Sequence, residues 1–373
     1  MPKILEVLPA LGHGGAEIMI LNLINSIKSN DVQIDFLVNG NEIGPLEESI
    51  KLNHHNIYHI SDQLYYNIPK YYSALKKIML DHGPYDIVHS HLNYLGAFVM
   101  SAAKSLNIPV RICHSHCTDF SFKHRSLLHK CMFYLMRHFM NSKSTRKLAC
   151  SKQAGISLFG KSKSDDVCVL NNSIDAEKFA EELSLVERAK LKEEFNIPCD
   201  AFVLGQVGRF IPLKNHSKTL RVFNEILKIN PNSHLVLVGD GPLLTQIKSQ
   251  AEELNISDFV TFTGGRNDVY KILKILDVCI LPSLHEGFPL VLTEAQAAGV
   301  KCVVTDTINK AINFFDMITF IPFSESDQYW AHECLDNTKN YPDPCVRVEL
   351  LKRLCYDIQT NVEVLKEIYG ITR

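Results

Sequence analysis

Short apolar runs alternate with longer amphipathic segments along most of this chain. In its first half the apolar runs predict strands over residues 4–8, 34–38, 57–60, 87–89, 110–113, 148–150 and 167–170. Segments with helical spacing of apolar residues, such as 16–28 and 70–81, separate most of these runs. Because strands that alternate with helices build βαβ units, the pattern predicts a parallel sheet covered by helices.

A stretch rich in Glu and Lys interrupts this alternation between about residues 175 and 199, and it predicts an exposed connector with a solvated helix. A second series of strands follows, over residues 202–206, 234–238, 260–263, 278–281 and 302–305. The fold class expected is therefore α/β, with two doubly wound, Rossmann-like domains in tandem. The expected bounds are 1–175 for the first domain, 176–199 for the connector and 200–354 for the second domain. The apolar pattern near the end of the chain predicts one or two further helices, and it leaves open which domain they cover.

The composition is that of an ordinary globular protein. The chain has 373 residues, 46% of them hydrophobic and 21% charged, and its formal net charge of −2 gives no electrostatic case for a nucleic-acid partner. No apolar run approaches the roughly 18 residues that a membrane span needs, and the first residues form a short strand pattern rather than a signal peptide. Eleven scattered cysteines, several inside apolar strands, fit a reducing compartment. We therefore expect a cytoplasmic location.

The segment between Glu286 and Glu294 carries the strongest chemical signal. It follows the apolar run 278–282 and leads into a short helix, for which Pro289 suits the first turn and Gly299 the C-terminal end. Free N–H groups at a helix N-terminus bind phosphate, and two flanking carboxylates can accept hydrogen bonds from sugar hydroxyls. The segment predicts a site for a ligand that is part phosphate and part sugar.

A first glycine cluster, Gly12, Gly14 and Gly15, follows the first predicted strand. Glycines at such a position let a ligand approach the backbone closely. The spacing differs from Gly-x-Gly-x-x-Gly, and the second strand ends without an acidic residue, so nicotinamide-dinucleotide binding is disfavoured. Two interpretations remain: a loop that contacts a phosphate or an acceptor, and a simple tight turn.

A second cluster opens the second domain with Gly208, Arg209 and Lys214. The guanidinium of Arg209 offers a planar fork for phosphate oxygens, and Lys214 adds a compact charge on a flexible stem. Two such cations near a helix N-terminus could neutralise a diphosphate without a metal ion. The alternative is a pair of solvated surface residues.

The sequence His-Ser-His occurs twice, ending at His91 and at His116, and each copy follows an apolar run. Alternate residues of a strand share a face, so the two rings of each pair could point the same way. A zinc site is conceivable but the spacing matches none of the usual metal patterns. A histidine beside a reacting sugar fits His116, whereas His89 or His91 fits a hydrogen-bonded core residue.

Residues 121–147 carry seven Lys or Arg, no acidic residue and many apolar residues. A basic amphipathic helix of this kind can lie on an anionic membrane surface. A crossover helix with one solvated face is the alternative.

These motifs, taken in order, resemble glycosyltransferase family 4, and within it the bacterial exopolysaccharide and capsule group. The matching segments are 14–17, 86–91, 111–116, 149–152, 172–175, 208–215, 238–242, 262–266, 281–283 and 286–299. The resemblance implies the GT-B fold, with two Rossmann-like domains facing a cleft, a nucleotide-sugar donor, retention of anomeric configuration and no metal or other cofactor. It also implies that a C-terminal helix, about 355–373, packs back on the first domain.

On the donor side, the resemblance implies that Glu294 holds the ribose hydroxyls and that Arg209 and Lys214 bind the diphosphate. Glu286 would contact the donor sugar. The remaining donor-binding residues implied are Gly14, Gly15, Gly241, Arg266, Gly287, Phe288, Pro289, Leu290 and Val291.

On the reaction and acceptor side, the resemblance implies a catalytic role for His116 beside the reacting centre, together with Glu286, Arg209 and Lys214. His114 is the alternative histidine, and Gly12 would lie on the acceptor side. The implied partners are a UDP-sugar donor and a glycan or polyprenyl-linked acceptor. The basic segment 121–147 separately favours peripheral attachment to the inner face of a membrane.

Two departures from the family pattern stand out. Ser173 replaces a glycine of the connector turn, and Ala311 stands where the exopolysaccharide group often has a glutamate. Ala311 keeps open the interpretation of a catalytically silent sugar-nucleotide-binding subunit. A nucleotide-sugar 2-epimerase, which shares this fold, is the other rival interpretation. A glycosidase also uses paired carboxylates, but it has no need of the two cations.

Overall fold

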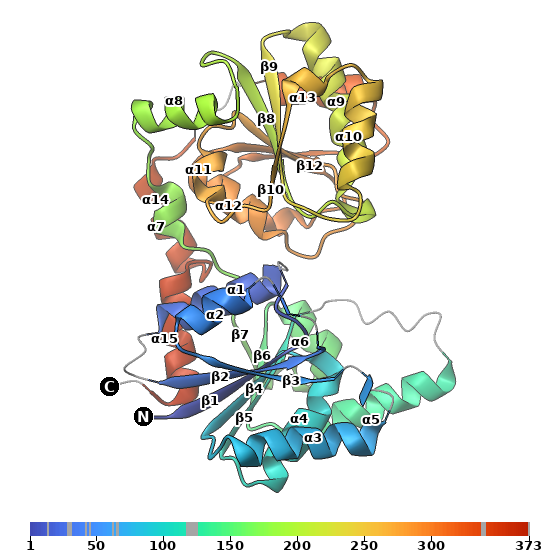
Figure 1. Ribbon diagram of the computed structural model, residues 1–373, viewed down its shortest axis with the longest axis vertical. Coiled ribbons are helices and arrows are strands. Elements are labelled where there is room, and N and C mark those ends of the chain that lie inside the picture. Colours follow the sequence, from blue (N-terminus) through green and yellow to red (C-terminus); the bar gives the residue numbers. More distant parts are fainter. Residues whose placement is uncertain are drawn as a thin grey trace. The chain divides into compact units, whose positions relative to one another are not determined.

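A computed structural model describes residues 1–12, 15–27, 32–41, 43–44, 46–61, 63–64, 67–116, 126–336 and 341–371. The chain divides into two compact units, of which the first comprises Met1–Ser173 and Ile358–Arg373 and the second Ile174–Asp357. Residues 176–199, expected as a connector, belong to the second unit, and the last helix belongs to the first (Figure 1).

The first unit is built on a parallel sheet of seven strands in the order β3-β2-β1-β4-β5-β6-β7. Its strands are β1 (Lys3–Leu8), β2 (Gln33–Asn39), β3 (Asn56–Ile60), β4 (Ile87–Ser90), β5 (Val110–Ser115), β6 (Arg146–Ala149) and β7 (Val167–Val169). Its α-helices are α1 (Gly15–Ser26), α2 (Glu47–Leu52), α3 (Ile68–Asp81), α4 (Gly96–Ser105), α5 (Leu127–Lys143), α6 (Lys152–Phe159) and α15 (Ile358–Tyr369).

Helices cover both faces of this sheet (Figure 1). Leu5 and Val7 face a core made with α3, α4 and α5, in which Tyr71 and Met140 are buried. Because side chains alternate along a strand, Glu6 points to the opposite face, toward α1 and α15. On this second face, polar residues such as Glu6 lie at the centre of the sheet.

The second unit contains a parallel sheet of six strands in the order β10-β9-β8-β11-β12-β13. Its strands are β8 (Phe202–Val207), β9 (Ser233–Val238), β10 (Val260–Gly264), β11 (Val278–Leu281), β12 (Lys301–Thr305) and β13 (Ile318–Ile321). Its α-helices are α7 (Ala176–Ala180), α8 (Leu185–Glu194), α9 (His216–Ile229), α10 (Leu244–Glu253), α11 (Val269–Leu273), α12 (Leu290–Ala298), α13 (Asp327–Leu335) and α14 (Pro344–Arg353).

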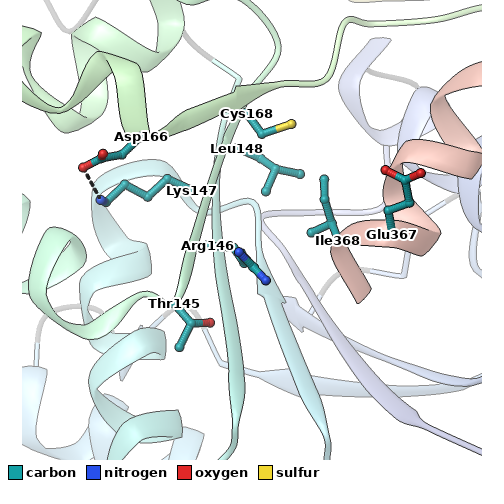
Figure 2. Close-up of a pocket in the computed structure, with 8 residues that line it drawn as sticks. All are labelled: Thr145, Arg146, Lys147, Leu148, Asp166, Cys168, Glu367 and Ile368. Atoms are coloured by element: carbon teal, nitrogen blue, oxygen red, sulfur yellow. Dashed lines mark ion pairs between the residues drawn. The ribbon is translucent and has the colours of Figure 1, made fainter. Parts of the chain in front are cut away.

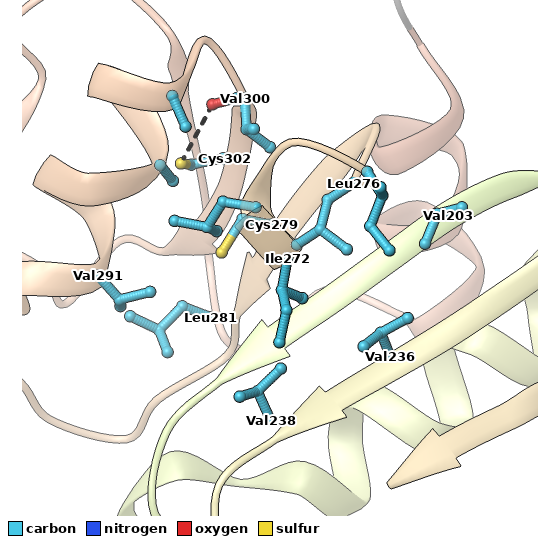
Figure 3. Close-up of a cluster of buried hydrophobic side chains, with 14 of the residues drawn as sticks. Val203, Val236, Val238, Ile272, Leu276, Cys279, Leu281, Val291, Val300 and Cys302 are labelled. Carbon is cyan, nitrogen blue, oxygen red and sulfur yellow. Dashed lines mark hydrogen bonds between the residues drawn. The ribbon is translucent and has the colours of Figure 1, made fainter. Parts of the chain in front are cut away.

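Its strands are apolar on both faces, as strands buried between two helical layers must be. Val203, Val236 and Cys279 pack with residues of α11 and α12 on one face (Figure 3). The alternate residues pack with α9, α10 and α13 on the other, around the fully buried Phe223 and Trp330.

The alternating pattern predicted the doubly wound architecture correctly. Both sheets are entirely parallel, and every strand expected from an apolar run is present. The edge strand β13 was missed because its four residues follow a short turn rather than a helical pattern.

Candidate functional site

The donor-binding residues predicted in the second unit lie near the carboxyl end of its sheet. In a doubly wound sheet, ligands bind outside the carboxyl ends of the strands. Arg209 and Lys214 follow β8, and Glu286 follows β11. Gly241 follows β9 and Arg266 follows β10, so the topology brings the predicted loops to one edge.

The helix after β11 begins and ends as the sequence indicated. Pro289 is the N-cap of α12, and no side chain among the described residues caps the helix there. Gly299 ends the helix with a φ of 80°, a left-handed conformation that favours glycine. The first turn, with Leu290 and Val291, therefore presents backbone N–H groups and the positive end of the helix dipole.

Lys214 and Glu286 form an ion pair at this edge. Lys214 Nζ lies 2.5 Å from Glu286 Oε1, and both side chains are largely buried. Two further bonds tie their loops together: Leu284 N–H donates to the carbonyl of Leu213 (2.9 Å), and Asn215 Nδ2 donates to that of Pro282 (3.3 Å). The structure thus brings together two residues that are 72 positions apart in the sequence.

A buried glutamine holds the loop that carries Lys214. Gln206 is fully buried on β8, and its Nε2 donates to the carbonyl of Lys214 at 2.8 Å. Its Oε1 accepts from the hydroxyl of Thr219 at 2.6 Å. Since a buried amide must be satisfied, these bonds fix the backbone at Lys214. No motif pointed to Gln206, apart from its being a polar residue inside an apolar strand.

Three other predicted residues have different environments. Arg209 is exposed, whereas Glu294 is partly buried on α12, and burial raises the pKa of its carboxyl to about 7. Arg266 pairs with Asp268 through two bonds of 2.8 Å and with Glu194 at 3.1 Å. Its guanidinium thus links the end of β10 to α8 and is already engaged by two carboxylates.

In the first unit, Gly12 follows β1 and Gly15 begins α1, while Gly14 lies outside the described residues. His114 is on β5, and His116 follows it directly. The carboxyl ends of β1, β4 and β5 are neighbours in the sheet, so these residues share one edge.

The four histidines of the two His-Ser-His motifs form one cluster around Glu6. His91 Nε2 lies 2.9 Å from Glu6 Oε2, and His91 Nδ1 lies 2.8 Å from His116 Nε2. The ring of His114 stacks on that of His89, with centroids 5.4 Å apart. Ring nitrogens of His89, His91 and His114 lie within 4.8 Å of one another.

Tyr369 of α15 completes the histidine cluster. Its hydroxyl donates to Glu6 Oε1 at 2.6 Å and lies 2.8 Å from His89 Nδ1. Neither Glu6 nor Tyr369 was a candidate from sequence. The available signal was a glutamate in the middle of the apolar run of residues 4–8.

Burial sets the charges of this cluster. Burial raises the pKa of Glu6, but the electrostatic interaction with the nearby His89 and the hydrogen bond from His91 outweigh it, so that this pKa lies well below its usual range. Burial, followed by the charge of His89, lowers the pKa of His91 to about 4. The pKa values of His114 and His116 are also lowered, first by burial and then by neighbouring imidazoles. Glu6 is therefore a carboxylate surrounded mainly by neutral rings.

A separate hollow of about 450 Å³ lies at the opposite edge of the first sheet (Figure 2). Arg146 and Lys147 at the start of β6 line it, with Asp166 before β7 and Glu367 on α15. Since it lies at the amino ends of parallel strands, it is away from the edge where such folds bind ligands.

Two Rossmann-like units, the second with the Lys214–Glu286 ion pair at its carboxyl edge, have the architecture of the GT-B fold, and the family matches identify the class as glycosyltransferases. Residues 13–178 match the family model described as Glycosyltransferase Family 4, and residues 187–313 match that described as Glycosyl transferases group 1.

Comparison with individual proteins agrees with these matches. The chain is 31% identical over 378 residues to EpsF of Bacillus subtilis (strain 168), named as a glycosyltransferase, covering 99% of this chain and 97% of that protein. It is 32% identical over 242 residues to the UDP-Gal:alpha-D-GlcNAc-diphosphoundecaprenol alpha-1,3-galactosyltransferase of Escherichia coli, covering 63% of this chain and 60% of that protein. The crystal structure of Anabaena HepE in complex with UDP and glucose superposes with a TM-score of 0.77 at 17% identity, covering all of both chains.

The chain belongs to glycosyltransferase family 4. It is an enzyme that transfers a sugar in polysaccharide or glycan biosynthesis.

Proposed function

We propose that this enzyme transfers a sugar from a UDP-sugar to a hydroxyl of a glycan or polyprenyl-linked acceptor, with retention of anomeric configuration and without a metal ion. The contact between Lys214 and Glu286 beside the uncapped start of α12 is the observation that carries this proposal. It unites a cation, a carboxylate and free N–H groups, which are the partners that a nucleoside diphosphate sugar requires.

The choice of donor and acceptor rests on the relatives. HepE is described in complex with UDP and glucose, and the galactosyltransferase from Escherichia coli is named for a UDP-sugar donor and a lipid-diphosphate acceptor. The present chain shares their fold or sequence, so the same donor class and a lipid-linked acceptor are the simplest assignment.

In the proposed reaction, the diphosphate gains negative charge as the bond to the sugar breaks. Lys214, Arg209 and the N-terminus of α12 stabilise this charge where it develops. These fixed positive groups replace a metal ion. When the diphosphate enters, it competes with Glu286 for Lys214, which frees the carboxylate of Glu286 to accept hydrogen bonds from the donor sugar. Glu294 holds the ribose hydroxyls, and His116 contacts a hydroxyl at the reacting centre.

Donor binding and turnover together test this function. UDP-sugars should raise the melting temperature of the enzyme by mass action. The variant Arg209→Ala should lose about 100-fold or more in kcat, as expected when one group that stabilises developing charge is removed. Arg221 of α9, an exposed arginine paired with Asp327 of α13, is the matched control, and Arg221→Ala should keep wild-type kcat. Equal kcat in the two variants would contradict the assignment.

The same assay distinguishes the rival activities. A 2-epimerase converts the donor without any acceptor, so incubating UDP-N-acetylglucosamine with the enzyme alone and following it by NMR separates the two. A silent subunit binds UDP but turns over no acceptor.

We further propose that α5 attaches the enzyme to an anionic membrane. Leu128, Met132, Leu135 and Phe139 recur at spacings of four, three and four residues and are all exposed. A different face of α5, with Phe133, Met136 and Met140, is buried in the core. The surrounding residues 121–147 contain basic residues and no acidic ones, which matches an anionic surface. Among the described residues, no helix is long and apolar enough to cross a bilayer.

Co-sedimentation with vesicles tests the membrane proposal. Binding is expected to vesicles containing phosphatidylglycerol and to be lost in Leu128→Ser/Leu135→Ser. Leu185→Ser/Val186→Ser, at the equally exposed start of α8, is the control that should bind like the wild type. Equal binding to vesicles of phosphatidylcholine alone would contradict the role of charge, and loss of self-association in the α5 variant without any vesicle binding would instead assign the stripe to a second copy of the chain.

A further inference from the structure

The cluster around Glu6 is unusual because it replaces apolar packing at the centre of a parallel sheet. Glu6, His89 and His114 come from the adjacent strands β1, β4 and β5, and all are almost completely buried. His89 Nε2 and both ring nitrogens of His114 make no hydrogen bond with the described residues, but the other members are hydrogen-bonded, and each of these bonds constrains the next. The bonds here form a chain that ends at His116.

At the Tyr369 end of this hydrogen-bond network, the donor and the acceptor of each bond are fixed. Burial, and then the charge of Glu6, raise the pKa of Tyr369 well above its usual value, so the phenol keeps its proton and donates it to Glu6 Oε1. The single Tyr369 proton is then in use, and His89 Nδ1 must donate to the phenol oxygen at 2.8 Å. Glu6, as a carboxylate, can only accept.

The acceptor role of Glu6 in turn fixes the donor and acceptor nitrogens of His91. Because Glu6 accepts, His91 Nε2 carries the proton of the 2.9 Å bond. In a neutral imidazole the other nitrogen is then an acceptor, so His91 Nδ1 accepts from His116 Nε2 at 2.8 Å. His116, also neutral, holds its proton on Nε2 and has a lone pair on Nδ1.

This lone pair has no partner. His116 Nδ1 is buried, and it makes no hydrogen bond with any part of the chain that the structure describes. The backbone N–H of His116 donates to Asn93 Oδ1 at 3.2 Å, which fixes the residue from the other side. A buried ring nitrogen without a partner calls for an explanation, and a ligand hydroxyl provides one.

We propose that Glu6 and His91 are positioning residues that hold His116 in the Nε2–H tautomer, so that its Nδ1 accepts a hydrogen bond from a hydroxyl of the bound sugar or acceptor. The proposal rests on the proposed function for the presence of that hydroxyl. The network itself is a property of the unliganded protein and has its own readout. In this arrangement the orientation of a residue at the reacting centre is set from β1, through two intervening hydrogen bonds.

A metal ion is the competing explanation for the same cluster. The ring nitrogens of His89, His91 and His114 lie close enough to share one ion. However, both nitrogens of His91 already take part in hydrogen bonds, so a metal would have to break the bond to Glu6 or the bond to His116. Stoichiometric zinc or another transition metal in the purified enzyme would overturn the proposal.

The tautomer can be observed directly by long-range ¹H–¹⁵N NMR of histidine-labelled enzyme, with His116 assigned from the spectrum of His116→Gln. In the wild type we expect an unprotonated Nδ1 and a protonated Nε2 near neutral pH. The opposite tautomer would overturn the proposal, and this measurement needs no substrate and no altered network.

The variant Glu6→Gln should change the tautomer of His116. Its amide oxygen can accept from Tyr369, which leaves the amide NH₂ to donate to His91 Nε2. His91 must then carry its proton on Nδ1 and donate to His116 Nε2, so the proton of His116 moves to Nδ1. We expect kcat to fall by about tenfold or more with little change in the KM for donor, because the substrate hydroxyl now faces a donor instead of an acceptor.

Asp35→Asn is the matched control. Asp35 is a fully buried carboxylate on the neighbouring strand β2, and it accepts from the hydroxyl of Tyr85 at 2.8 Å and from Asn56 Nδ2 at 2.8 Å. No hydrogen bond of the described residues joins it to the histidines, so this variant should be less stable but keep the wild-type tautomer and kcat. An unchanged tautomer in Glu6→Gln would refute the network. A changed tautomer with unchanged kcat would uphold the network and refute the role of His116 in the proposed function.

Discussion

The raised pKa of Glu294 makes a quantitative prediction about donor affinity. Burial shifts the pKa of this carboxyl to about 7, so in the free enzyme at pH 6 about one molecule in ten has an ionised Glu294. If the ribose hydroxyls of the donor require the carboxylate as acceptor, the affinity follows the ionised fraction. That fraction rises to about nine-tenths at pH 8, so the dissociation constant should be about tenfold larger at pH 6 than at pH 8.

Isothermal titration calorimetry with a UDP-sugar measures this effect. A UDP-sugar is preferable to UDP because its diphosphate has no terminal phosphate group that titrates in this range. Binding should release a proton near pH 6, since the ligand selects the ionised form, and the observed enthalpy should then depend on the ionisation enthalpy of the buffer.

The variant Glu294→Gln should bind donor weakly, and its affinity should not change between pH 6 and pH 8. Glu252→Gln, at an exposed carboxylate of α10, should show the wild-type dependence. A tenfold change that persists in Glu294→Gln would refute the assignment of this residue, and a pH-independent wild type would refute the linkage.

Two further predictions concern the architecture of the site. In the double-mutant cycle of Lys214→Met and Glu286→Gln, we expect a coupling free energy of about 0.5–3 kcal/mol in chemical unfolding of the ligand-free enzyme, and strictly additive effects would contradict the ion pair. Gly239→Ala should lower the free energy of unfolding by more than about 1 kcal/mol, because φ is +136° and a Cβ would lie 2.2 Å from the carbonyl oxygen of Gly208. Gly264→Ala, with φ of +72° but nothing within 4 Å of the added Cβ, should lower the free energy of unfolding by less. Equal losses of unfolding free energy in the two variants, measured by urea unfolding, would show that the contact with Gly208 is unimportant.

Local patterns predicted the elements because each strand and helix is encoded by nearby residues. The Pro289 start and Gly299 end of α12 are examples, since both depend only on backbone preferences. Contacts between loops could not be predicted in this way. That Lys214 meets Glu286 depends on the order in which β8 and β11 pair, which no short motif records.

The polar cluster around Glu6 in the first unit shows more clearly that local patterns do not predict contacts between distant segments. The two His-Ser-His motifs were visible in the sequence, but their shared partner Glu6 comes from β1, and Tyr369 comes from the end of the chain. Glu6 stands out in its apolar run, but nothing in its own segment identifies the histidines or Tyr369 as its partners. Only the strand order β1-β4-β5 reveals that they form one network.

The position of α15 has a consequence for how the protein is made. The first unit includes residues 358–373, so its sequence is interrupted by the whole of the second unit. During synthesis the ribosome releases the second unit before it releases Tyr369. Until α15 has been synthesised, the carboxylate of Glu6 therefore lacks the phenol of Tyr369 that donates to it at 2.6 Å. The first unit thus reaches its final form only after α15 has been synthesised, and a chain truncated before Tyr369 cannot complete its histidine network.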